Sequence, residues 1–126
     1  MSEVAIVILN YNGKQFLQQF LPSIIQFSAG AQIIVADNGS ADGSADLIRD
    51  SFPLVGLISI SNNLGFCGGY NYALKQIDAT YYVLLNSDVE VTKGWLDPVI
   101  ERFRSNLNIA AIQPKILSFK RKSDFE

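Results

Sequence analysis

Four apolar runs rich in β-branched residues recur along the chain, and their starts lie 23 to 28 residues apart. None of them alternates strictly between apolar and polar positions. Such runs are typical of parallel strands that are buried on both faces. The sequence therefore predicts four strands, at Val4–Leu9, Gln32–Ala36, Val55–Ile60 and Thr80–Leu85.

Apolar residues at three- and four-residue steps fill the gaps between these runs and predict helices. Pro22 lies inside the first of these patterns, so we expect a kink or a break near Leu21. Asp42 is a candidate N-cap for the second helix, and Asp97-Pro98 indicates the N-cap and first position of the last. The apolar positions are Phe16, Leu17, Phe20, Leu21, Ile24 and Phe27; Leu47 and Ile48; Tyr70, Ala73, Leu74 and Ile77; and Val99, Ile100, Phe103 and Leu107.

Strand and helix thus alternate four times. With right-handed crossovers, this order gives an α/β fold: a Rossmann-like, mostly parallel sheet with helices on both faces. The 126 residues are 48% hydrophobic and 17% charged, as in one globular domain. We expect that domain to span residues 1–118, followed by a polar C-terminal end at 119–126.

Charge and residue usage narrow the possible functions. The formal net charge is −2, so no basic surface indicates a nucleic-acid partner. The chain has no histidine and one cysteine, which excludes Ser-His-Asp or Cys-His catalysis and an internal disulfide. Any metal bound here should be an oxygen-preferring one such as Mg²⁺ or Mn²⁺.

The chain shows no targeting or transmembrane segment. Its first apolar run, Val4–Leu9, has six residues, which is too short for a signal-peptide core or for a membrane span. We therefore expect a cytoplasmic location.

Amide and carboxylate side chains follow all four predicted strands, several of them beside a glycine. Open α/β sheets bind ligands beyond the carboxyl ends of their strands, so these positions indicate a site for a polar ligand. The alternative is that they only form turns, which Asn, Asp and Gly favour whatever the function. The segments are Asn10-Tyr11-Asn12-Gly13, Asp37-Asn38-Gly39-Ser40, Asn62-Asn63-Leu64-Gly65 and Asn86-Ser87-Asp88-Val89-Glu90.

Two nucleotide-binding motifs that the sequence lacks restrict the classes of ligand to be expected. The sequence has neither a G-x-x-x-x-G-K-[ST] motif nor a G-x-G-x-x-G turn after its first strand, so a P-loop nucleotidase and a dinucleotide cofactor are not expected. Asp88 follows a buried strand, where a carboxylate can hold Mg²⁺ or Mn²⁺ against a diphosphate. Taken alone, Asp88 could equally be a cap or turn residue.

Taken together, six segments resemble the inverting glycosyltransferases of family 2, and most of all their rhamnosyltransferase-like branch. The resemblance runs from about Val4 to Leu117. The segments are VAIVILNYNG, VADNGSADGS, NNLGFCGGYNYAL, LLNSDVEV, GWLDPV and IQPKIL.

The resemblance implies the GT-A fold and a set of donor-site residues. Asp37 matches the acidic residue that reads the nucleotide base, and Asn10 lies where the first strand lines the nucleotide pocket. Asn86 and Asp88 match the outer positions of the D-x-D motif, with Asp88 as the metal-contacting residue. The pair of glycines in the G-F-x-G-G segment is expected to border the donor pocket: Gly68 and Gly69.

The implied activity is sugar transfer, with inversion, from a nucleoside-diphosphate sugar to an acceptor hydroxyl. A saccharide or a lipid-linked acceptor, used in cell-wall or polysaccharide synthesis, would place the enzyme in the cytoplasm or at the inner face of the membrane. No carboxylate here matches the family's general base, which we expect beyond Glu126, so this chain would supply the donor- and metal-binding half. The alternative is a non-catalytic module of the same fold that binds a nucleotide sugar or a protein.

Overall fold

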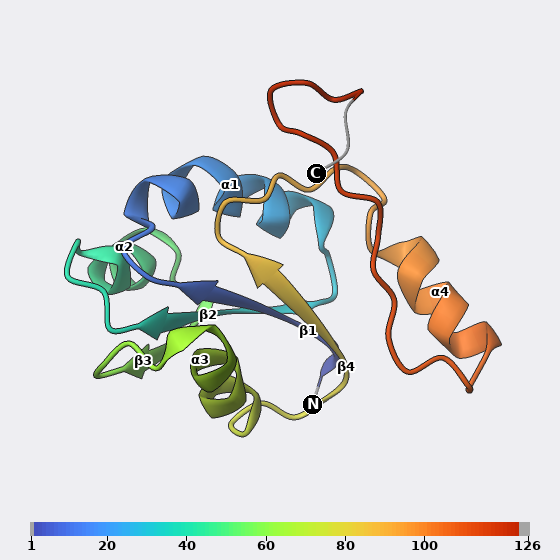
Figure 1. Cartoon of the computed structure of the whole chain (residues 1–126), viewed down its shortest axis with the longest axis horizontal. Coiled ribbons are helices and arrows are strands. Elements are labelled where there is room, and N and C mark those ends of the chain that lie inside the picture. Colours follow the sequence, from blue (N-terminus) through green and yellow to red (C-terminus); the bar gives the residue numbers. More distant parts are fainter. Residues whose placement is uncertain (1, 124–126) are drawn as a thin grey trace.

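The computed structural model describes residues 2–123 and forms a four-stranded parallel sheet in the order β3-β2-β1-β4, with helices on both faces (Figure 1). This is the architecture that the sequence predicts. Strands and helices alternate along the chain as β1 (Ser2–Asn10), α1 (Lys14–Phe27), β2 (Gln32–Asn38), α2 (Ser44–Ser51), β3 (Gly56–Ile60), α3 (Gly65–Leu74), β4 (Ala79–Asn86) and α4 (Asp97–Ser105).

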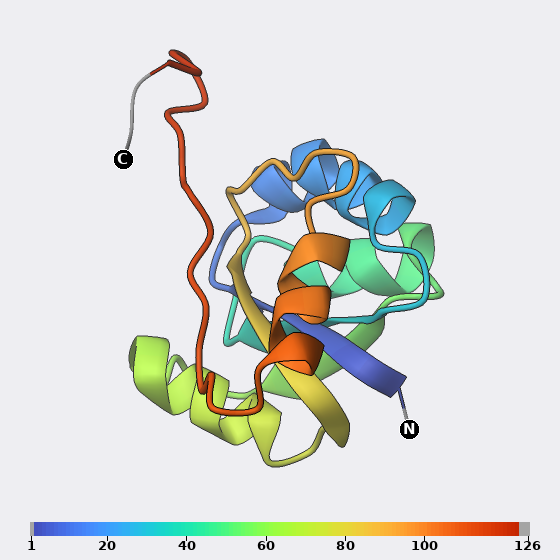
Figure 2. The same cartoon turned by 90° about the vertical axis from the view of Figure 1, so that its right-hand side faces the viewer.

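Two hydrophobic clusters, one on each face of the sheet, hold the helices in place. The larger cluster joins Ile6 and Ile8 of β1 to side chains of α1, α2 and α4. The smaller one joins Val7 of β1 and Ala36 of β2 to α3. Figure 2 shows α3 alone on one side of the sheet and the other helices on the opposite side.

The prediction that all four strands are buried on both faces is wrong for β3 and β4. Those strands form the two edges of the sheet, and alternate residues of β4 are exposed on the face that carries α3. Tyr82 and Leu84 lie there, paired in register with Ala5 and Val7 of β1. An apolar run therefore identified each strand but did not distinguish a central strand from an edge strand.

The break considered at Pro22 does not occur, because α1 runs continuously from Lys14 to Phe27. An internal proline costs a helix about 3 kcal/mol. Burial of large apolar side chains returns about 1.5–3 kcal/mol each, and α1 buries four of them while Pro22 faces solvent. Packing against the sheet therefore outweighs the local cost. The buried residues are Leu17, Phe20, Leu21 and Ile24.

The last helix differs from its prediction at both ends. Asp97 is its first residue and Leu96 its N-cap, one position from what the sequence indicated. Leu107 lies beyond the helix end at Ser105 and is exposed rather than part of the apolar face. Over residues 2–123, no helix is both long and apolar enough to cross a bilayer.

Candidate functional site

The carboxyl ends of β1 and β2 place two predicted site residues side by side. Asn10 and Asp37 are register partners in the parallel pair, and the Asn10 amide Nδ2 donates to Asp37 Oδ1 at 3.0 Å. The other carboxylate oxygen accepts the backbone N–H of Ser40 at 3.2 Å. Asn10 is 0% and Asp37 5% exposed, so the pair is buried and held in place at the carboxyl ends of the two central strands.

One buried acceptor in this pair is left without a donor. Among residues 2–123, Asn10 Oδ1 has no hydrogen-bond partner, although it is buried. A buried unpaired polar atom costs about 1–3 kcal/mol, so such atoms usually have a partner in the functional state. A Cβ atom on Gly13 would lie 2.5 Å from this oxygen. Oδ1 therefore packs directly against Gly13, and any other residue at this position would clash with it.

The loops after β1 and β2 hold each other through a reciprocal pair of contacts. Ser40 Oγ accepts the backbone N–H of Asn12 at 2.9 Å, and Asn12 Oδ1 accepts the backbone N–H of Ala41 at 2.8 Å. Asn12 adopts a left-handed backbone with φ of 50°, a conformation that asparagine tolerates better than most residues. These contacts fix the loop beside Asn10.

Asp42 caps two helices from the same loop. One carboxylate oxygen accepts the backbone N–H of Lys14 at 2.9 Å, at the start of α1. The other accepts the backbone N–H of Ser44 at 3.0 Å and also its hydroxyl, at the start of α2. The sequence predicted Asp42 as the N-cap of α2, but the N-cap is Gly43 and Asp42 lies one residue before it. The contact of Asp42 with the start of α1 was not predicted. Burial alone would raise the pKa of Asp42, but these hydrogen bonds from Ser44 and Lys14 outweigh it and lower the pKa below 3.8.

The predicted glycine pair lies on α3, which packs on one face of the sheet beside the carboxyl ends of β1 and β2. Gly69 is buried, and a Cβ there would lie 2.7 Å from Leu9 Cδ1 and 2.9 Å from Asn38 Nδ2. Gly68 is half-buried one residue earlier. Gly69 therefore allows α3 to lie directly on β1 and β2, while a role of either glycine toward a ligand remains a prediction.

Asn86 and Asp88 lie at the end of the neighbouring strand. Asn86 pairs in register with Leu9, so it is one strand across from the Asn10–Asp37 pair, and both Asn86 and Asp88 are exposed. Ser87 Oγ would be 3.1 Å from a Cβ on Gly13, which brings this turn against the loop after β1.

The side-chain oxygens of Asn86, Ser87 and Asp88 suit a hard cation that completes its coordination shell with phosphate and water. Asp88 supplies the carboxylate, and the described residues contain no cluster of three or more metal-ligating His, Cys, Asp or Glu side chains. A cation here would therefore depend on its bound ligand for most of its coordination.

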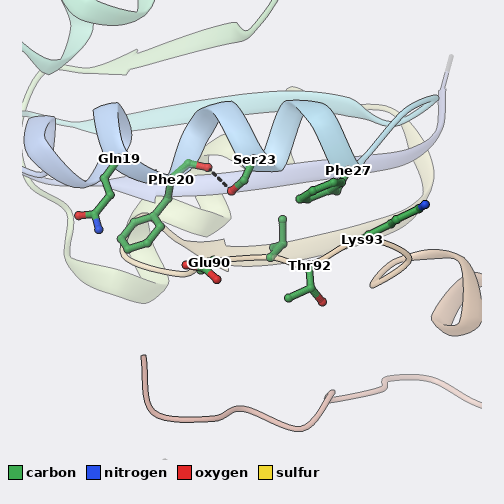
Figure 3. Close-up of a pocket in the computed structure, with 8 residues that line it drawn as sticks. Gln19, Phe20, Ser23, Phe27, Glu90, Thr92 and Lys93 are labelled. Atoms are coloured by element: carbon green, nitrogen blue, oxygen red, sulfur yellow. Dashed lines mark hydrogen bonds between the residues drawn. The ribbon is translucent and has the colours of Figure 1, made fainter. Parts of the chain in front are cut away.

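A separate groove of about 360 Å³ lies along the flank of α1. Phe20, Ser23 and Phe27 of α1 line one side of it, and Glu90, Thr92 and Lys93, from the segment after the 86–88 turn, line the other (Figure 3). The Ser23 hydroxyl donates back to the Phe20 carbonyl at 2.9 Å. No pattern in the sequence indicated this groove.

The predicted polar C-terminal end contacts one border of that groove. Phe119 packs edge-on against Phe20 with 5.4 Å between ring centroids, and Lys122 Nζ lies 3.2 Å from Glu90 Oε1. Residues 124–126 of that end lie outside the described part of the chain, and the boundary at residue 118 remains a prediction.

Sequence reasoning overlooked three residues that shape the site: Asn12, Asn38 and Ser40. Each lies in a strand-end segment that the sequence had already marked as polar. Their roles depend on partners 25 to 29 residues away, which local spacing does not indicate.

Comparison with known proteins decides the family. Residues 5–123 match the family described as glycosyl transferase family 2. The chain belongs to glycosyl transferase family 2. The resemblance carried by the six sequence segments is thereby confirmed.

Several relatives of this family 2 chain are named transferases or polymerases. An uncharacterized glycosyltransferase of Haemophilus influenzae is 26% identical over 86% of the chain and 35% of its own length. The teichoic acid poly(glycerol phosphate) polymerase of Staphylococcus epidermidis is 25% identical over 88% of the chain and 16% of its own length. The N-acetylglucosaminyl-diphospho-decaprenol L-rhamnosyltransferase of Mycobacterium tuberculosis is 26% identical over 76% of the chain and 35% of its own length.

Solved structures show the same fold as this family 2 chain. S. aureus TarS 1-349 in complex with UDP-GlcNAc superposes with a TM-score of 0.72 at 16% identity, covering 92% of the chain and 38% of that protein. The mannosyltransferase PcManGT from Pyrobaculum calidifontis, in complex with GDP-Man and Mn²⁺, gives 0.61 at 20% identity, covering 70% and 28%. The chain spans about a third or less of the length of the three relatives from Haemophilus influenzae, Staphylococcus epidermidis and Mycobacterium tuberculosis.

Proposed function

We propose that this chain forms the nucleotide-sugar-binding part of a glycosyltransferase that moves a sugar from a nucleoside-diphosphate sugar to an acceptor hydroxyl with inversion. The buried Asn10–Asp37 pair is the observation that carries the proposal, because it combines a fixed carboxylate with an unpaired acceptor at the carboxyl edge of the sheet. Membership of family 2 supports the same interpretation.

Within this proposal, Asp37 and Asn10 bind the nucleoside. Both present oxygens that accept hydrogen bonds from a base or ribose, and the Ser40 N–H and the Asn10 amide keep the Asp37 carboxylate from rotating. A ligand donor at Asn10 Oδ1 would satisfy the one buried acceptor that the described residues leave unpaired. Because Asn10 Oδ1 is buried and packs against Gly13, the residues that cover it would have to move aside for a ligand donor to reach it.

Asn86, Ser87 and Asp88 are proposed to face the diphosphate, with Asp88 as the metal-contacting residue. Mg²⁺ or Mn²⁺ bound at Asp88 would supply positive charge against the departing diphosphate. The structure of PcManGT with GDP-Man and Mn²⁺ supports the choice of cation class. Asn86 can accept a hydrogen bond but brings no charge, so Asp88 should account for most of the electrostatic effect.

The acceptor is proposed to be a saccharide or a lipid-linked saccharide, supported by the relative named for its action on N-acetylglucosaminyl-diphospho-decaprenol. Because relatives carry transferase and polymerase names, the non-catalytic module is not favoured. A location in the cytoplasm, or at the inner face of the membrane, remains a prediction.

Calorimetric titration of the chain with UDP-, dTDP- and GDP-sugars, with and without Mn²⁺, tests this proposal. We expect one of them to bind and Mn²⁺ to strengthen the binding. Asp88→Ala should weaken the Mn²⁺-dependent binding by about 10- to 100-fold, the equivalent of losing one charged contact. Asn86→Ala should have a smaller effect.

Asp78→Ala is the matched control, since Asp78 is an exposed carboxylate just before β4, at the end of that strand opposite to Asp88. It should bind like the unsubstituted chain. A folded chain that binds none of the three nucleotide sugars would refute the proposal. Equal and negligible effects of Asp88→Ala and Asn86→Ala would remove the 86–88 turn from the site.

A further inference from the structure

Asn38 joins two strand-end loops through one buried carboxamide. It is the last residue of β2, is 2% exposed, and lies between the Asp37 carboxylate and the turn at Gly39. Its Nδ2 donates to Asn63 Oδ1 at 3.0 Å and to the Gly65 carbonyl at 3.1 Å. Its Oδ1 accepts the backbone N–H of Leu64 at 3.0 Å. Both of its N–H donors are therefore used on the segment that starts α3.

This contact set requires an asparagine. Only a side chain with two donors and an acceptor on one planar group can make all three bonds at once, and an aspartate of the same shape has no donor when ionised. Asn63 extends this set of hydrogen bonds, here called the Asn38 brace, because its Oδ1 also accepts the backbone N–H of Gly65 at 2.8 Å. Gly65 itself has φ of 75°, a left-handed conformation that suits glycine.

The first turns of α3 are held from two further directions. Gly69 lies so close that a Cβ would be 2.9 Å from Asn38 Nδ2. The buried Tyr70 hydroxyl donates to the Leu85 carbonyl of β4 at 3.0 Å, one residue before Asn86. The start of α3 is thus fixed to β2 on one side and to β4 on the other. It lies near the carboxyl ends of the strands, as does the Asn10–Asp37 pair.

We infer that Asn38 is a positioning residue for donor binding: it holds the backbone of Leu64–Gly68 in place beside the nucleoside diphosphate without touching that ligand itself. This inference rests on the proposed function. It assigns a task to a residue of the D-N-G-S segment for which the family resemblance had named only the aspartate. Residues 64–67 are exposed and Gly68 half-buried, so this segment is open to solvent beside the carboxyl end of β2, while Asn38 is covered.

Asn38→Asp tests the inference, because it keeps the shape and the acceptor and removes both donors. The two hydrogen bonds to Asn63 and Gly65 are lost, and the new carboxylate, buried against these two acceptor oxygens, repels them, so the segment loosens. If the positioned state is needed for binding, affinity falls with its population. We expect affinity for UDP, dTDP or GDP, whichever the unsubstituted chain binds, to fall about tenfold.

Asn62→Asp is the matched control. It makes the same change of charge and residue type in the same loop, on an exposed side chain that makes no hydrogen bond within residues 2–123. Its nucleotide affinity should stay within a factor of about two of the unsubstituted chain. Should Asn38→Asp fail to fold, Asn63→Ala removes the exposed partner of the same brace and should give a smaller loss in the same direction.

Amide hydrogen exchange supplies the readout that separates positioning from general destabilisation. In Asn38→Asp, the amides of residues 64–68 should exchange faster, while those of β1 should be unchanged. Uniformly faster exchange throughout the sheet, or unchanged nucleotide affinity in Asn38→Asp, would overturn the inference alone. Absence of nucleotide binding by the unsubstituted chain would overturn the proposed function, and the inference with it.

Discussion

Replacing Asp42 with alanine should destabilise this chain more than a usual surface substitution, because one carboxylate caps both α1 and α2. Each lost N-cap contact costs about 1 kcal/mol. The Ser44 hydroxyl, which is buried, would also lose its acceptor, at a cost of about 1 kcal/mol or more. Asp42→Ala should therefore lower the free energy of unfolding by about 3 kcal/mol.

The stability that Asp42→Ala loses should become smaller as the pH is lowered. The pKa of Asp42 is lowered in the folded chain, so its ionised form stabilises the fold. That contribution is complete above the unfolded pKa of about 4 and is lost as pH falls through the lower folded value. The difference between the unsubstituted chain and Asp42→Ala should be constant from about pH 5 to 7 and shrink below about pH 4.

Urea unfolding at pH 7 and pH 3, followed by the fluorescence of the partly buried Trp95 and by circular dichroism, measures both quantities. Asp50→Ala is the control, since Asp50 is exposed on α2 and should change stability by no more than about 0.5 kcal/mol. An Asp42→Ala loss below about 0.5 kcal/mol, or a loss that is the same at both pH values, would refute the double cap.

Two further substitutions test how α3 is held on the sheet. Gly69→Ala should cost about 1–3 kcal/mol in urea unfolding, because its Cβ would lie 2.9 Å from the fixed Asn38 amide; an unchanged midpoint would show that the helix can shift freely. Tyr70→Phe should cost about 1 kcal/mol, since it removes the donor to the Leu85 carbonyl. Tyr72→Phe, exposed on the same helix, is its control and should be neutral, whereas equal effects of the two tyrosine substitutions would argue against a specific Tyr70 bond.

The sequence was most informative where a property depends on a short segment. Apolar runs at regular spacing predicted the four strands, and the helical steps between them predicted a parallel α/β sheet, both of which the structure confirms. Asn10 and Asp37 could be placed near each other from sequence alone, because the ends of parallel strands meet at one edge of the sheet. Six segments in order were enough to indicate the family.

Tertiary structure decided what depends on contacts between distant segments. Only strand pairing made β4 an edge and left Leu84 exposed, and only packing on the sheet kept α1 continuous through Pro22. From the sequence, Asn38 could not be distinguished from an ordinary turn residue. Its role depends on hydrogen bonds with Leu64 and Gly65, which only the folded chain brings to it. Local patterns indicate the average burial and backbone preference of a segment, whereas a hydrogen bond across 25 or more residues exists only once the sheet order is fixed.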